Sequence, residues 1–145
     1  MGLLKRTIRQ LVAYYKRKFE TNDPFEIAKL LNIEVQMGDI GSRSGCYMYV
    51  KRHKCIFINE NLEEYEMRFV MAHELGHAIL HPKENCYFIR NKTLLLNSKI
   101  EVQANQFAAE LLIPDSLIEE HKDLSIEQFA RLTGYNEKLI ELRLK

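Results

Sequence analysis

Hydrophobic side chains recur at helical spacing near the start of the chain. Between residues 3 and 20 they form one stripe, and the opposite face is strongly basic. A basic amphipathic helix can contact nucleic acid or an acidic partner, but this period is more typical of a helix docked on a hydrophobic core. We therefore expect residues 3–20 to form a core-docked helix with a solvated basic face. The stripe consists of Leu4, Ile8, Leu11, Val12, Tyr15 and Phe19.

The pattern then predicts a short helix followed by strands. Asp23 and Pro24 are typical of a helix start, with aspartate as the N-cap and proline at the first helical position. Residues 33–37 alternate like a strand, and residues 46–50 and 55–59 are two apolar runs joined by a basic tip. We interpret these two runs as an antiparallel hairpin.

Two longer helices follow in the middle of the chain. Asn61, with Glu64 three positions later, predicts a helix N-terminus, and Pro82 ends that helix. Residues 83–97 are less regular. A second helix is expected over about residues 98–113, and it ends at a proline.

The tail, residues 116–145, is expected to hold short helices capped by Ser125 and Asn136. Ala130, Gly134 and Ile140 also fit the spacing of a helix-turn-helix, which would make residues 136–145 a recognition helix. Such residues recur easily at this spacing, however. Residues 126–145 carry three acidic and four basic side chains, which is a poor electrostatic footprint for DNA.

Composition narrows the class of protein. A chain of 145 residues that is 46% hydrophobic suits a single domain over residues 1–145. Within it we expect an N-terminal amphipathic helix (1–22), a core (24–115) and a helical tail (116–145). The formal charge of +1 argues against a generic polyanion binder, and no apolar run is long enough for a membrane span. Three cysteines without a CxxC pair predict a reduced, cytoplasmic protein.

One segment carries a pattern with specific chemistry. Residues 73–77 read His-Glu-Leu-Gly-His, an HExxH motif inside the helix predicted to begin at Asn61. Histidines four positions apart lie on one helical face, so His73 and His77 can reach the same metal ion. Zinc accepts neutral imidazole nitrogens, and Glu74 would be the general base for a water that the metal activates. Shuffled sequences of this composition would contain the motif in roughly 2% of cases.

A catalytic zinc site requires a third protein ligand. His81 continues the row of histidines, but the rise of a straight helix places it about 12 Å from His73 along the axis. One ion cannot span that distance. We therefore interpret His81 as a helix C-terminal residue, where the helix dipole favours it.

Carboxylates on the following helix are better placed. Glu101 shares a face with small residues that would let the two helices approach closely, whereas Glu110 should face elsewhere. Ser98 and Glu101 also fit a capping box, so spacing alone leaves Glu101 open between metal ligand and helix cap. Asn105, one turn later, is either the hydrogen-bond acceptor of a ligand histidine or an ordinary polar residue in mid-helix.

Two segments carry a recognisable pattern. They are Arg68-Phe69-Val70-Met71-Ala72-His73-Glu74-Leu75-Gly76-His77 and Glu101-Val102-Gln103-Ala104-Asn105-Gln106-Phe107-Ala108-Ala109-Glu110-Leu111-Leu112-Ile113-Pro114. Together they resemble the ImmA/IrrE family of metallopeptidases, and the hairpin ending Ile56-Phe57-Ile58-Asn59 is also similar. The resemblance covers about residues 24–115 and implies that this part is the catalytic core. It also implies that His73, His77 and Glu101 bind Zn²⁺ and that Glu74 is the catalytic base.

The sequence departs from the family pattern at two positions. Gln103 stands where many relatives have a second glutamate, and we expect it to face away from the site with little effect. Asn105 stands where related sites often have aspartate, and an amide raises imidazole basicity less than a carboxylate does.

We therefore expect an α+β fold: a small antiparallel sheet packed with helices, a zincin-like HExxH helix in the core and short C-terminal helices. The resemblance implies a zinc-dependent endopeptidase of phage or mobile-element type, gluzincin-like in its ligands. Its implied partner is a protein substrate, a helix-turn-helix repressor. Two alternatives remain open, a zinc-binding protein that sequesters its partner without cutting it, and a helix-turn-helix DNA-binding module in residues 125–145.

Overall fold

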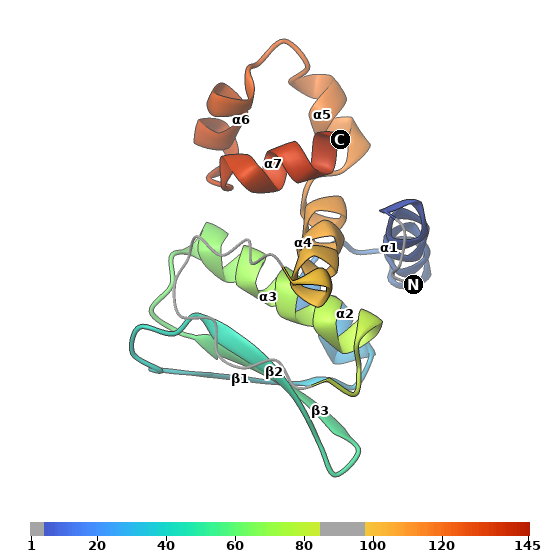
Figure 1. Ribbon diagram of the computed structural model, residues 1–145, viewed down its shortest axis with the longest axis vertical. Helices are drawn as coiled ribbons and strands as arrows, with labels where there is room; N and C mark the ends of the chain where they lie inside the picture. The colour runs from blue at the N-terminus through green and yellow to red at the C-terminus, as the bar shows by residue number, and fades with distance from the viewer. Residues whose placement is uncertain (1–4, 85–97) are drawn as a thin grey trace.

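The computed structural model describes residues 5–84 and 98–145, and it has the expected α+β class (Figure 1). Most of the stretch predicted to be irregular, residues 85–97, and Leu4 of the first stripe lie outside the described residues. The elements are α1 (Lys5–Phe19), α2 (Pro24–Leu30), β1 (Glu34–Gly38), β2 (Gly45–Val50), β3 (His53–Asn59), α3 (Glu64–Leu80), α4 (Lys99–Leu112), α5 (Asp115–Glu120), α6 (Ile126–Thr133) and α7 (Glu137–Leu144).

The sheet is mixed rather than wholly antiparallel. Strands β2 and β3 form the predicted antiparallel hairpin, and Lys51 and Arg52 adopt positive φ angles in its turn. Strand β1 pairs with the other edge of β3 in parallel, with Glu34 opposite Cys55, so the strand order is β1-β3-β2. Alternation along β1 predicts a strand, but it carries no information about the neighbour or its direction. That is why the expectation of a purely antiparallel sheet was wrong for this pair.

Capping signals located most helix starts correctly. Asp23 accepts a hydrogen bond from the Phe25 backbone amide, and Pro24 is the first residue of α2. Ser125 and Asn136 cap α6 and α7 through their side chains. The prediction for α3 was wrong, because the helix begins only at Glu64.

The residue predicted to cap α3 instead belongs to a turn that precedes the helix. The backbone amide of Asn61 donates to Oδ1 of Asn59 at 3.0 Å. Asn59 also donates from its amide nitrogen to the Gly41 and Arg43 carbonyls, so it connects the end of β3 to the loop between β1 and β2. A polar residue three positions before a glutamate is therefore explained here by a turn rather than a capping box.

Helix α3 lies between the sheet and α4 (Figure 1). Every residue from Val70 to Ala78 is buried, because this part of the helix is covered on both sides. At Gly76 the two helices approach so closely that an added Cβ would lie 3.1 Å from Cβ of Phe107 and 3.2 Å from the Ala104 carbonyl oxygen. The HExxH segment therefore occupies the centre of the molecule.

Helix α1 packs on α4 through Ile8 and Val12, as the hydrophobic stripe predicts. Among the described residues, no helix combines the length and apolar character needed to cross a bilayer.

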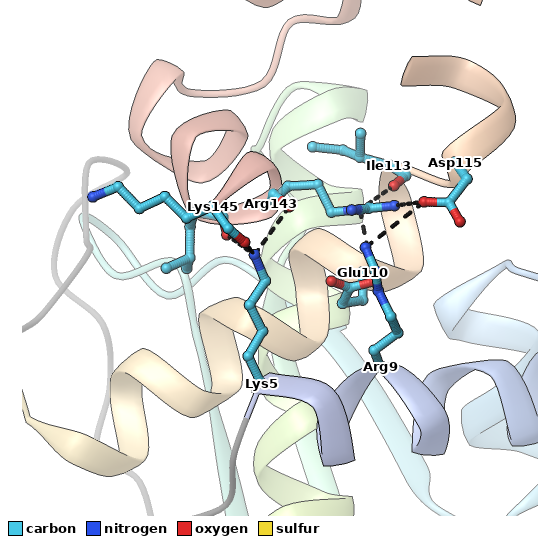
Figure 2. Close-up of polar contacts among 8 residues, drawn as sticks. Lys5, Arg9, Glu110, Ile113, Asp115, Arg143 and Lys145 are labelled. Atoms are coloured by element: carbon cyan, nitrogen blue, oxygen red, sulfur yellow. Dashed lines mark hydrogen bonds and ion pairs between the residues drawn. The ribbon is translucent and has the colours of Figure 1, made fainter. Parts of the chain in front are cut away.

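A polar cluster joins α1, α4, α5 and α7 (Figure 2). We call Arg9, Glu110, Asp115 and Arg143 the inter-helix ion cluster. Arg9 Nε donates to Glu110 Oε1 at 3.3 Å, and Arg143 Nε lies 3.7 Å from the same oxygen. Arg143 also donates to Asp115 and, at 2.6 Å, to the Ile113 carbonyl. Glu110 therefore faces away from the histidines, as its helical position predicts.

Candidate metal centre

Two helices bring three potential metal ligands together. His73 and His77 lie one turn apart on α3, and Glu101 comes from the first turn of α4. Nε2 of His73 lies 2.8 Å from Glu101 Oε1, Nε2 of His77 lies 3.2 Å from that oxygen, and the two nitrogens are 3.2 Å apart. Both imidazoles are buried, and Glu101 is largely buried.

These separations suit a tetrahedral metal ion. Two ligand atoms at the usual 2.0–2.1 Å from zinc stand about 3.3 Å apart at the tetrahedral angle. The three observed distances, from 2.8 to 3.2 Å, are close to that value. The donor set of two imidazole nitrogens and one carboxylate oxygen is one that zinc prefers in catalytic sites. The residues present therefore fit a zinc ion.

The first turn of α4 is not built as a capping box. Ser98 precedes the helix as its N-cap residue, but its side chain makes no capping hydrogen bond. The Glu101 carboxylate instead turns toward the two histidines. Of the two roles that spacing left open for Glu101, the geometry favours the one at the metal centre.

Asn105 contacts the opposite side of the His73 ring. Its Oδ1 lies 2.7 Å from Nδ1 of His73, and both side chains are buried. An amide oxygen only accepts hydrogen bonds, so Nδ1 carries the hydrogen and Nε2 keeps its lone pair for a metal. This contact is compatible with the first of the two roles that spacing allows for Asn105.

Gln103 does not face away as predicted. It is buried, and its Oε1 lies 2.7 Å from Nε2 of His81. His81 is indeed the C-terminal capping residue of α3, yet its Nδ1 also lies 3.3 Å from Nδ1 of His77. Sequence reasoning missed both contacts, because a helical wheel for α4 alone does not include the end of α3.

Glu74 is the most unusual group of the site. It is completely buried, and neither carboxylate oxygen has a hydrogen-bond partner in the part of the chain that the structure describes. Burial raises the pKa of Glu74 to about 8, the charge of Glu101 acts in the same direction, and His73 opposes it. Buried carboxyl groups are normally paired, so this one indicates a functional constraint.

The pKa values of Glu101, His77 and His73 are shifted in different directions. Burial alone would raise the pKa of Glu101, but hydrogen bonds and charge interactions with the two histidines hold it well below its usual range. Burial lowers the pKa of His77, with the nearby His73 acting in the same direction. His73 is equally buried, but Glu101 and Glu74 raise its pKa overall. Glu101 is therefore the group that stays anionic without a metal.

Strand β2 passes close to this site. Burial, followed by the charge of Glu74, raises the pKa of the Cys46 thiol to about 12. Cys46 is fully buried and stays a neutral thiol at physiological pH. It therefore contributes an apolar lining beside Glu74, and the nitrogen and oxygen donor set has no need of it.

Two histidines share one face of this buried helix, a carboxylate from the next helix faces them, and Glu74 lacks a hydrogen-bond partner in the described part of the chain. Such an arrangement is typical of metal-dependent peptidases. The model of the IrrE N-terminal-like domain, peptidase family M78, matches residues 28–145. The chain belongs to this family of metallopeptidases.

Three relatives illustrate its range. The chain is 38% identical over 144 residues to the uncharacterized immunity region protein 2 of Bacillus phage phi105, covering 97% of this chain and 89% of that protein. It is 37% identical over 102 residues to the metallopeptidase ImmA of Bacillus subtilis, covering 69% of this chain and 59% of ImmA. Identity to the radiation response metalloprotease IrrE of Deinococcus radiodurans is 28% over 124 residues, covering 83% of this chain and 37% of IrrE.

Proposed function

We propose that this protein is a zinc-dependent endopeptidase that hydrolyses a peptide bond in a protein partner. The observation that carries the proposal is the buried carboxylate of Glu74, which has no hydrogen-bond partner among residues 5–84 and 98–145 and lies beside a group of three potential ligands. A fully buried acid without a hydrogen bond costs stability, and a general base for an attacking water is a role that explains its retention.

In this proposal His73, His77 and Glu101 hold the metal. Zinc, when bound there, supplies a Lewis acid that makes a water acidic and polarises the scissile carbonyl. Asn105 accepts the Nδ1 hydrogen of His73 and so keeps Nε2 free as a ligand. The low pKa of Glu101 means that its carboxylate is anionic before the metal arrives.

Glu74 would remove the proton from the attacking water and then deliver it to the leaving amine. Its pKa of about 8 in the metal-free chain results mainly from burial. A nearby dication would favour the ionised form, so Glu74 would be ready to act as a base at neutral pH. The Cys46 thiol on the neighbouring strand β2 is buried, and its raised pKa keeps it neutral, so it does not compete with Glu74 as a base.

For the substrate we propose a helix-turn-helix repressor. Support comes from the family resemblance, which implies such a substrate, and from the similarity to a phage immunity region protein. The cytoplasm, where such repressors act, would then be its location.

A cleavage assay with a matched variant tests this function. Purified protein loaded with zinc is mixed with a helix-turn-helix repressor encoded by the same genetic element, and fragments are followed by electrophoresis and mass spectrometry. Glu74→Gln should lower the cleavage rate by at least the roughly 10²–10⁴-fold that general bases contribute, with zinc content unchanged. Glu64→Gln, an exposed glutamate in the first turn of the same helix, is the control and should cleave normally.

The outcome also separates cleavage from partner sequestration. Cleavage that persists in Glu74→Gln would contradict the assignment of the base. A wild-type protein that binds zinc and captures the repressor without producing fragments would support partner sequestration instead.

Direct DNA binding by the tail is the less favoured alternative. Leu139, Ile140 and Arg143 of α7 are buried, because this helix packs against α4. The exposed side chains of α7 include Glu137, Lys138 and Glu141, and two acids against one base match DNA phosphates poorly. A salt-dependent gel shift with the purified protein alone would favour the DNA-binding alternative.

A further inference from the structure

A continuous row of buried polar side chains leads away from the metal-facing atom of His77. Its Nε2 faces Glu101, and its Nδ1, on the other side of the ring, lies 3.3 Å from Nδ1 of His81. Nε2 of His81 then lies 2.7 Å from Oε1 of Gln103. All three side chains are at most 8% exposed.

The amide at the end of this row determines where every hydrogen lies. Oε1 of Gln103 can only accept, so Nε2 of His81 carries a hydrogen and donates it. In the neutral form of His81, Nδ1 is then an acceptor, and Nδ1 of His77 donates to it. The lone pair of His77 consequently lies on Nε2, the atom that faces Glu101. The reverse order would place a hydrogen on Nε2, where it would block a metal.

We propose that His81 and Gln103 are positioning residues of the metal centre. Together they hold His77 in the tautomer and ring orientation that a metal ligand requires. This inference rests on the proposed metal site and assigns a role there to two residues that the spacing argument had excluded. It also gives the two ligand histidines equivalent support from α4, since Asn105 contacts His73 directly and Gln103 reaches His77 through His81.

The test compares zinc affinity among variants at position 103. Gln103→Leu removes the terminal acceptor, and zinc affinity, measured by competition with a chromophoric chelator, should fall about 10–100-fold. Gln103→Glu keeps an acceptor oxygen and should bind zinc at least as tightly as wild type. Gln106→Leu, a partly buried glutamine on the same helix, is the matched control and should leave affinity unchanged.

A second measurement reports the tautomer itself. Nitrogen-15 NMR of the histidine rings in the metal-free protein should show His77 mainly as the Nδ1–H form in wild type and Gln103→Glu. Gln103→Leu should show a mixture of both tautomers, while its melting temperature stays within the range of Gln106→Leu. A role in packing alone would change melting temperature and leave the tautomer as it is.

Three results would overturn the inference. These are equal zinc affinity in Gln103→Leu and Gln106→Leu, equal loss in Gln103→Leu and Gln103→Glu, and an unchanged tautomer in Gln103→Leu. A wild-type protein without zinc affinity would contradict the proposed metal site itself. That result is distinguishable, because it does not depend on comparing variants.

Discussion

The side chain of Glu74 is held in surroundings that do not stabilise its charge. It is fully buried, and its oxygens find no hydrogen bond within the described part of the chain. Leaving one buried polar group unpaired costs about 1–3 kcal/mol, and more for a charged group. The neutral form is favoured in the metal-free chain, as its pKa of about 8 indicates. A site prepared for a metal ion thus lowers the stability of the metal-free fold.

This cost predicts a pH dependence for the metal-free protein. The folded pKa of Glu74 lies above its ordinary 4.5, so the folded state binds the proton more tightly between pH 4.5 and about 8. Its contribution to stability is therefore largest at low pH and is lost as the pH rises through that window. Glu74→Gln has no such group. From pH 5 to 8 its unfolding free energy should increase relative to wild type, by on the order of a few kcal/mol.

Urea unfolding of both proteins in the presence of a chelator measures this difference. Other titrating groups, including Glu101 with its opposite shift, are common to the two proteins and largely cancel. A difference that stays constant from pH 5 to 8 would show that Glu74 is ionised in the metal-free fold.

Residues differ in how far the sequence predicted their positions. The spacing of His73 and His77 placed both on one face, because four positions complete about one helical turn. For Glu101 and Asn105 the spacing allowed two roles each, because it does not encode the helix crossing that places both side chains beside the histidines. Gln103 was predicted wrongly. Only two positions separate it from Glu101, but its side chain reaches His81 at the end of α3.

At the scale of elements, the α3–α4 crossing determines which side chains meet. Gly76 and Ala104 let the helix axes approach closely, which brings the start of α4 to the middle of α3. Glu101 in the first turn of α4 then meets the histidines, and Gln103 and Asn105 meet His81 and His73. One close contact between small residues thus positions the polar groups around it.

The start of α4 offers a test that separates ligand from cap. Glu101→Ala should lower zinc affinity by more than the roughly 10–100-fold expected for an outer hydrogen-bond partner. It should change the stability of the helix little, since Ser98 already lacks a capping bond. Metal analysis after dialysis and circular dichroism check the two parts. Glu137→Ala, an exposed glutamate in the first turn of α7, is the control.

Unchanged zinc content in Glu101→Ala would return this residue to the role of a helix-terminal carboxylate. A large loss of the circular dichroism helix signal in metal-free Glu101→Ala would also favour the helix-terminal role.

Elements with local signals were predicted best. The caps of α2, α6 and α7 depend on hydrogen bonds within a few residues, so the sequence alone contains them. The direction of β1 depends on a partner about twenty residues away, and no local pattern encodes it. The prediction of a helix cap at Asn61 was wrong because Asn59, two positions earlier, forms a turn with it.

At the scale of the whole molecule, the inter-helix ion cluster joins segments that are far apart in sequence. Glu110 and Arg143 are at most 5% exposed, while Arg9 and Asp115 lie nearer the surface (Figure 2). The two arginines approach one oxygen of Glu110, and Lys5 adds hydrogen bonds to backbone carbonyls at the end of α7. These polar contacts therefore hold both α1 and α7 against α4.

Removing one charged partner from the inter-helix ion cluster should lower the stability of the fold. Arg143→Met leaves the buried Glu110 carboxylate with less compensation, and the unfolding free energy should fall by about 3–5 kcal/mol. The double variant with Glu110→Leu removes both charges and should recover part of that loss. Arg131→Met on the exposed face of α6 is the control and should cost at most about 0.5 kcal/mol.

Urea unfolding of the metal-free proteins measures the unfolding free energies of Arg143→Met, of the double variant and of the Arg131→Met control. An equal loss for Arg143→Met and Arg131→Met would show that Glu110 is compensated without Arg143.

The cluster also has a consequence for the order in which the chain folds. Arg143 reaches the Ile113 carbonyl across 30 residues, whereas Arg9 reaches Glu110 across 101. Closing the longer loop costs about 1 kcal/mol more in chain entropy. On loop entropy alone, we therefore expect α7 to dock on α4 before α1 does, so that the buried Glu110 already faces Arg143 when Arg9 reaches it.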